Sequence, residues 1–131
     1  MNSSLELHDS KVQVIEVDAG LLRIVFSSAY VHRSAGRPGI DAGAGYMQAA
    51  ELAFSGATWV GVPEQCSGSI SDGSVLVAGQ SLSLIPLPFS ASGNISAEIV
   101  FVSGVVLSVS ATSVVCSCFG EPRFVENYVA G

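Results

Sequence analysis

Residues 30–46 concentrate most of the side chains that could do chemistry. The segment reads YVHRSAGRPGIDAGAGY and holds two of the five basic residues and one of the two histidines. Arginine offers a planar fork of donors that suits a carboxylate or a phosphate, and histidine titrates near neutral pH. We therefore take this segment as a candidate binding site. Its candidate residues are Tyr30, His32, Arg33, Ser34, Arg37 and Asp41.

The same residues also allow a purely structural role. Arg33 and Arg37 could pair with Asp41 and nearby acids, and so pin a long loop onto the sheet. Because the segment contains four glycines, we expect it to leave the strand and turn over one end of the β structure. In the binding alternative, at least one arginine faces a concavity that it shares with His32 or Asp41.

No residue is predicted to be catalytic. His8, Asp9 and Ser10 have the composition of a hydrolase triad, but consecutive residues do not reach that geometry by proximity alone. We expect Asp9 or Ser10 to turn the chain into the first strand. The glycines of residues 30–46 lack the Gly-Lys-Ser/Thr of a phosphate loop, and no G-x-S-x-G elbow occurs. These patterns favour a binding protein over an enzyme.

The cysteines indicate a reducing compartment. There are three of them, an odd count, and the first residues show no secretory signal. We expect free thiols and a cytoplasmic location. Cys116 and Cys118 share one face of a strand, but no second pair stands at a spacing typical of zinc sites. We therefore predict no metal site and no cofactor.

Charged residues are scarce and mostly acidic. They make up 12% of the chain, about half the usual share of roughly 25%, and the net charge is -6. Duplex nucleic acid requires a clustered basic face, so we predict no nucleic-acid partner. Within residues 65–120 only Asp72 and Glu98 carry a charge. We expect a second copy, in a homodimer, or another protein to cover this half.

Alternation of apolar and polar residues predicts strands in most of the chain. In residues 21–30, Leu22, Ile24, Phe26 and Tyr30 fall on one face. Residues 11–17 precede them, so the two segments form a hairpin. For residues 46–54 a strand is favoured over a short helix.

A second hairpin joins residues 95–102 to residues 105–111 through Ser103 and Gly104. Its apolar face includes Phe101, which we place in the core with Phe26. Residues 99–120 are uncharged and long enough to span a bilayer, but their alternating Ser and Thr favour strands, so no membrane partner is predicted. Residues 81–89 contain two prolines, which predicts an edge strand or an irregular crossing.

These segments amount to about eight short strands, and the recurring helices of a parallel α/β fold are missing. We predict one all-β domain over residues 1–131, either an antiparallel β-sandwich or a small barrel.

Two short motifs resemble known bacterial proteins. Leu7-His8-Asp9-Ser10, followed by two β segments, resembles the start of several small bacterial all-β families, some of which are immunity proteins that neutralise toxins. Residues 29–34 and 86–89 resemble uncharacterised bacterial proteins of similar length. The resemblance implies a cytoplasmic β domain that binds a protein, and no catalytic residue carries over.

Two functions therefore remain open. The first is a non-enzymatic, cytoplasmic β domain that binds a protein partner, either a toxin or a second copy of itself. The second is a small anionic-ligand or enzymatic site in residues 30–46, at the mouth of a barrel.

Overall fold

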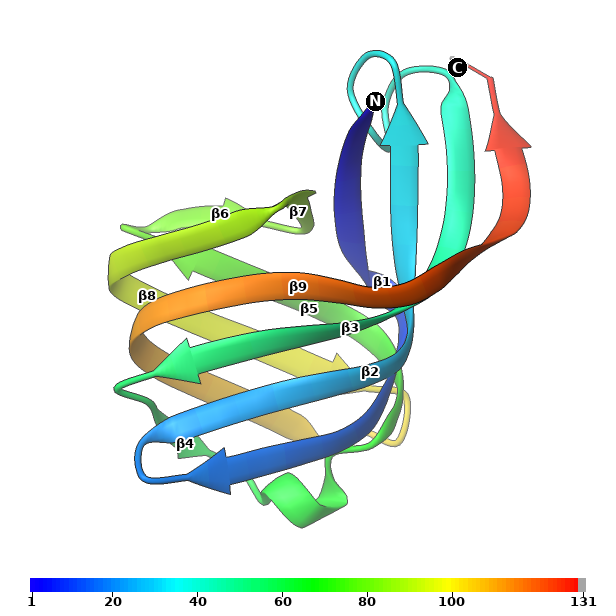
Figure 1. Cartoon of the computed structure of the whole chain (residues 1–131). Coiled ribbons are helices and arrows are strands. Elements are labelled where there is room, and N and C mark those ends of the chain that lie inside the picture. Colours follow the sequence, from blue (N-terminus) through cyan, green and yellow to red (C-terminus); the bar gives the residue numbers. More distant parts are fainter. Residues whose placement is uncertain (130–131) are drawn as a thin grey trace.

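The computed structural model describes residues 1–129, which fold almost entirely into β-strands (Figure 1). A single 3-10 turn, η1, interrupts them, and every strand pairing is antiparallel. The all-β prediction is confirmed. The elements are β1 Asn2–Asp18, β2 Leu21–Ser34, β3 Gly43–Ser55, β4 Thr58–Val60, η1 Pro63–Gln65, β5 Gly68–Val77, β6 Gln80–Leu82, β7 Leu84–Leu87, β8 Phe89–Phe101 and β9 Val106–Tyr128.

Six strands form a small barrel. They follow the order β1-β2-β3-β9-β8-β5, and β5 returns to β1 through the pairs Lys11 with Ser69 and Val12 with Gly68. The short strands extend this ring at its margins, since β6 pairs with β5, β4 with β9 and β7 with β1. The ring encloses the core, in which Phe26, Phe54 and Phe101 are at most 1% exposed. The predicted core positions Phe26 and Phe101 are confirmed.

Most of the predicted strands are present. Residues 46–54 belong to strand β3, and the hairpin across Ser103 and Gly104 joins β8 to β9. Strand β9 continues past residue 119 as one bent strand. Pro86 lies in β7, which pairs only with β1 among the described residues, as expected for a proline-bearing edge strand. No helix within residues 1–129 is long and apolar enough to cross a bilayer.

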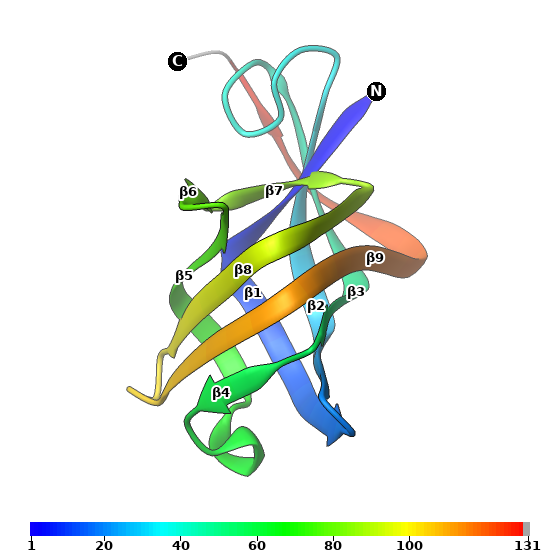
Figure 2. The ribbon, with the colours of Figure 1, turned by 90° about the vertical axis from the view of Figure 1, so that its left-hand side faces the viewer.

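Four strands extend beyond the barrel and form an open sheet there (Figure 1). This sheet, here called the extension, consists of residues 2–6 of β1, 30–34 of β2, 43–47 of β3 and 123–128 of β9, bordered on the β1 side by β7. Figure 2 shows that the start of β1, the end of β9 and the loop between β2 and β3 lie on this side of the barrel.

Each long strand is irregular where the barrel gives way to the extension. The pairing of β1 with β2 jumps from Glu6 to Lys11, the pairing of β2 with β3 from Phe26 to Ala29, and the pairing of β3 with β9 is shifted next to Met47. A bulge adds a residue to one strand and so exchanges its two faces. These shifts form a row of bulges across the sheet.

The row of bulges corrects the predicted face of Tyr30. The sequence places Tyr30 with Phe26, but the bulge at residues 27–28 puts Ala29 opposite Gln48 and Tyr30 opposite Met47. Consequently Val31 and Arg33 continue the interior face of the barrel into the extension. Tyr30 and His32 lie on the other face, here called the outer face.

The expectation that residues 30–46 form one loop is also wrong. Residues 30–34 belong to β2 and residues 43–46 to β3, so only residues 35–42 form a loop. Gly43 and Gly45 lie within strand β3, at positions where an atom of β2 comes so close that no side chain would fit. A Cβ on Gly45 would collide with the Tyr30 hydroxyl, and one on Gly43 with the Arg33 carbonyl oxygen. At these two positions glycine allows a neighbouring strand to come close, and it does not form a turn.

Ser10 completes the bulge in β1. The first strand begins at Asn2, so Asp9 and Ser10 do not lead into it as predicted but interrupt it, with Asp9 at φ 71°. The Ser10 side chain is fully buried. Its hydroxyl donates to the Glu6 carbonyl oxygen at 2.5 Å and accepts the Tyr30 backbone N–H at 2.9 Å. It thus replaces two ladder bonds that the bulge breaks.

We expect Ser10→Ala to lower the free energy of unfolding by about 1–3 kcal/mol, because it leaves the Tyr30 N–H buried without an acceptor. Urea denaturation measures this difference. Ser27→Ala is the matched control, since Ser27 is an exposed serine of the same hairpin, with a long 3.4 Å bond to Lys11. Equal midpoints for the two variants would contradict the assignment.

Candidate functional site

The structure divides the candidate residues of the sequence among three places. Arg33 lies on the interior face of the extension, His32 on the outer face and Arg37 in the loop. Neighbouring residues of a strand point to opposite faces, so Arg33 and His32 cannot meet. The hollow that Arg33 lines contains neither His32 nor Asp41. Arg33 therefore does not share this hollow with either residue, whereas Arg37 contacts Asp41 in the loop.

The hollow next to Arg33 has a volume of about 390 Å³. It lies where the interior face of the barrel continues into the extension, between β7 on one side and β2, β3 and β9 on the other. One side chain in its lining is charged, and the rest are apolar, small or neutral polar groups. The lining residues are Ser3, Val31, Arg33, Gln48, Leu87, Pro88, Cys116, Ser117 and Cys118.

Arg33 is held in place without an acidic partner. Its Cζ lies 4.8 Å from the centroid of the Tyr46 ring, a cation–π distance. Tyr46 in turn packs edge-on against Phe124, with 5.8 Å between ring centroids. Within residues 1–129 the buried Nε of Arg33 has no hydrogen-bond partner, and no ion pair involves Arg33. Its guanidinium is oriented but electrostatically uncompensated.

The thiols of the hollow are not nucleophiles. Burial, assisted by the neighbouring Cys118, raises the pKa of Cys116 to about 12. Burial also raises the pKa of Cys118, although the nearby Arg33 charge opposes this. Both are free cysteines, and at neutral pH both are protonated, the form that does not attack electrophiles.

His32 is enclosed on the outer face. It is 7% exposed, with ring centroids 4.9 Å from Tyr30 and 5.2 Å from Tyr128. The loop covers it at Gly39, where an added Cβ would contact the imidazole ring. Neither ring nitrogen has a hydrogen-bond partner within residues 1–129. Its Nε2 lies 3.6 Å from Glu6 Oε1.

The outer face is acidic. The Tyr30 and Tyr128 hydroxyls touch each other, and each donates to Glu126 Oε1, at 2.6 and 3.2 Å. Burial raises the pKa of Tyr128, and the charges of Glu6 and Asp9 raise it further. Three carboxylates therefore surround a pair of phenols on this face.

The remaining candidates hold the loop together. Ser34 Oγ donates to the Ala42 carbonyl at 2.7 Å and accepts the Gly36 N–H at 3.0 Å. Asp41 Oδ2 accepts the Arg37 backbone N–H at 2.7 Å and its Nε–H at 3.3 Å. The purely structural role considered for both arginines therefore applies to Arg37, whose charge is paired with Asp41. It does not apply to Arg33.

Sequence reasoning missed Glu6 and Glu126 on the outer face. Glu6 faces Tyr30 across β1 and β2, and Glu126 faces Gly45 across β9 and β3. These neighbours are far apart in the chain, and only the strand register brings them together. No local signal in the sequence marks them.

Comparisons with protein-family models, curated proteins and solved structures found no match for this chain.

We expect the Asp41 carboxyl to titrate below its ordinary value of 3.8, because the Arg37 backbone N–H, and then its side chain, stabilise the carboxylate. A lowered folded pKa stabilises the loop above the unfolded pKa, and this contribution is lost as the pH falls through the folded value. An NMR titration of Asp41 checks the midpoint, with the Arg37 amide as a second reporter. Arg37→Ala keeps the backbone donor and so retains most of the lowering. A midpoint at or above 3.8 in the unmodified chain would refute this account.

Proposed function

We propose that the chain is a cytoplasmic, non-enzymatic binding domain whose hollow takes a small anionic ligand with an apolar body. One observation carries the proposal: Arg33 lines a hollow of about 390 Å³ and forms no ion pair within residues 1–129. This volume falls in the range of small-molecule sites, roughly 300–1,000 Å³.

The lining indicates the chemical class of the ligand. The Arg33 guanidinium presents donors to a carboxylate, sulfonate or phosphate group, and stacking on Tyr46 fixes its orientation. Val31, Leu87 and Pro88 offer apolar surface to the rest of the molecule. A monoanion with a short alkyl or aromatic body matches one cation beside an apolar wall.

Binding is favoured over catalysis because the hollow lacks acid–base groups. None of its lining residues is a histidine or a carboxylate, and the thiols of Cys116 and Cys118 are held protonated. General acid–base and nucleophilic chemistry both require such groups. The free thiols of Cys66, Cys116 and Cys118 agree with a cytoplasmic location.

The test uses 1-anilinonaphthalene-8-sulfonate as a fluorescent anionic probe and octanoate as its competitor. We expect octanoate to displace the probe and the uncharged octanamide to displace it much less. Arg33→Met should weaken binding of the probe roughly 10- to 100-fold, which corresponds to the loss of a hydrogen bond to a charged group.

Arg37→Met is the matched control, because it removes one arginine of the same hairpin whose charge Asp41 already pairs. It should leave probe binding unchanged. Equal displacement by octanoate and octanamide, or equal affinity of the Arg33 and Arg37 variants, would rule out an anion site at Arg33.

A second candidate function is self-association through the end of β9. Among the charge-poor strands, β8 and the barrel part of β9 have neighbours on both sides, and the edge strands β6 and β7 are only three and four residues long. A longer open edge lies at residues 123–128, which pair only with β3 within the described chain. Phe124 and Val125 are 57% and 45% exposed there. Unpaired strand edges are templates for another strand.

A second copy is a complementary partner for this edge. An antiparallel two-fold pairing centred on Val125 sets this residue opposite its counterpart and Phe124 opposite Glu126 of the other copy. No like charges then stand directly opposite each other, and such charges would destabilise the pairing. A strand of a protein toxin would pair with the same edge of β9, so this edge also suits the toxin-binding alternative.

We expect a homodimer at high micromolar concentration by sedimentation equilibrium. Val125→Lys should return a monomer, because an edge lysine prevents strand pairing. Val17→Lys, at a residue of β1 with 41% exposure, should leave the dimer intact. A monomer for the unmodified chain would exclude self-association and leave a different protein as the only partner for this edge.

A further inference from the structure

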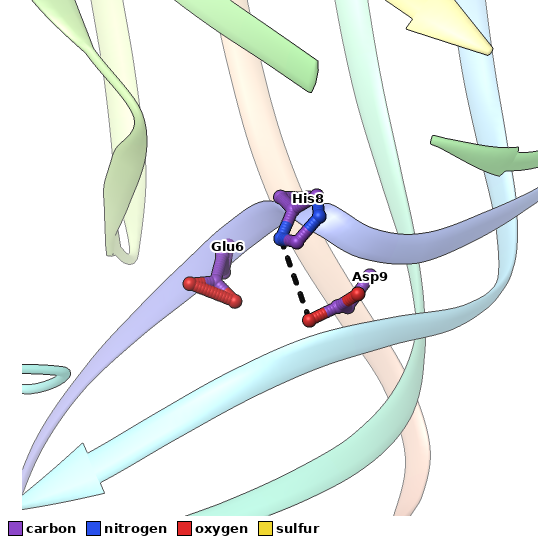
Figure 3. Close-up of side chains that lie close together, drawn as sticks. All are labelled: Glu6, His8 and Asp9. Carbon is purple, nitrogen blue, oxygen red and sulfur yellow. Dashed lines mark ion pairs between the residues drawn. The ribbon is translucent and has the colours of Figure 1, made fainter. Parts of the chain in front are cut away.

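The bulge of β1 gathers three metal-ligating side chains (Figure 3). Glu6 and His8 are two residues apart on the strand, and the bulge with its positive φ at Asp9 turns the third side chain toward them. Their ligand atoms all lie within 4.8 Å of one another. His8 Nδ1 is 3.4 Å from Asp9 Oδ2. His8 and Asp9 are exposed, so the group is open to solvent.

A fourth group approaches from β2. His32 is more than nine-tenths buried, its two nitrogens have no hydrogen-bond partner in residues 1–129, and its Nε2 points at Glu6 Oε1 from 3.6 Å. A buried polar group without a partner costs free energy, about 1–3 kcal/mol. The unpartnered His32 imidazole is therefore a second, independent indication of a ligand next to the Glu6 carboxylate.

We propose that Glu6, His8, Asp9 and His32 form a binding site for a divalent transition-metal ion, with zinc as the best match. The site joins the bulge of β1 to β2 on the outer face of the extension. It lies on the opposite face from the hollow at Arg33 and does not depend on the function proposed for that hollow.

The distances suit tetrahedral coordination. Zinc binds histidine nitrogen and carboxylate oxygen at about 2.0–2.2 Å, which sets neighbouring ligand atoms about 3.3–3.6 Å apart. The pairs His8–Asp9 and His32–Glu6 are separated by 3.4 and 3.6 Å. Both separations are close to this tetrahedral edge. The proposed site requires the exposed His8 and Asp9 side chains to rotate toward His32.

Ligand type and local charge both favour such an ion. Two imidazoles with two carboxylates prefer zinc and its first-row neighbours over calcium or magnesium, which favour sets of oxygen ligands. Within residues 1–129 no lysine or arginine forms an ion pair with Glu6 or Asp9. Glu126 adds a third negative charge near the Tyr30 hydroxyl. A cation offsets this concentration of acids.

The experiment titrates the untagged full chain with zinc chloride in a calorimeter and follows the histidine ring nitrogens by NMR. We expect one ion per chain, a melting temperature that rises with zinc concentration, and a shift of the His32 Nε2 signal. Glu6→Gln, His8→Asn and Asp9→Asn should each weaken zinc binding at least about 10-fold. Asparagine tolerates the positive φ of Asp9, so Asp9→Asn preserves the bulge.

Glu16→Gln is the control, since it removes an exposed acid from the same strand outside the cluster, and it should bind zinc like the unmodified chain. Zinc binding that persists in the three variants but disappears in Cys118→Ser would assign the ion to thiols and overturn the proposal. So would zinc binding that leaves the His32 signals unchanged, because β2 would then contribute no ligand. Absence of binding at millimolar zinc would overturn it outright.

Discussion

The row of bulges is the constraint on which the rest of the structure depends. Strands long enough to serve both the barrel and the extension must leave the ring without losing their backbone hydrogen bonds. In β1 the buried Ser10 hydroxyl makes this possible, since it bonds to both Glu6 and Tyr30 where the ladder is broken. A fully buried serine is unusual in a core of this kind. Here it substitutes for main-chain groups.

The bulges also decide which side chains meet. Without the extra residue in β2, Arg33 would face away from the interior and His32 would face inward. With it, a lone guanidinium closes an apolar hollow, and an imidazole faces the carboxylate of Glu6. Arg33 and a group of carboxylates thus lie on opposite faces of one thin sheet. Gly45 adds to this division, because its missing side chain leaves room for the Tyr30 and Tyr128 hydroxyls.

The sequence predicted the regular parts of the barrel and missed what depends on register. The spacing of Leu22, Ile24 and Phe26 at every second position indicates a strand with one buried face. Ser103-Gly104 is a local turn signal that predicts the hairpin of β8 and β9. Nothing local marks Ser27 and Ser28 as a bulge, so the face of every later residue in β2 was unpredictable. Several glycines within residues 30–46 predict a loop, but Gly43 and Gly45 lie in strand β3. Proximity of Glu6 to His32 follows only from the pairing of β1 with β2.

The extension, unlike the barrel, has two free edges, at β7 and at the end of β9, within the described residues. The strands of the barrel surround the buried core and are joined back to β1 by two residue pairs of β5, whereas an open sheet can unzip from its margins. Amide protons at the end of β9 and in β7 should therefore exchange with solvent through partial openings that leave the barrel folded. Any molecule that bridges two strands of the extension would slow this exchange across the whole sheet. The extension is thus a sub-globular unit whose opening free energy reports occupancy of either of its faces.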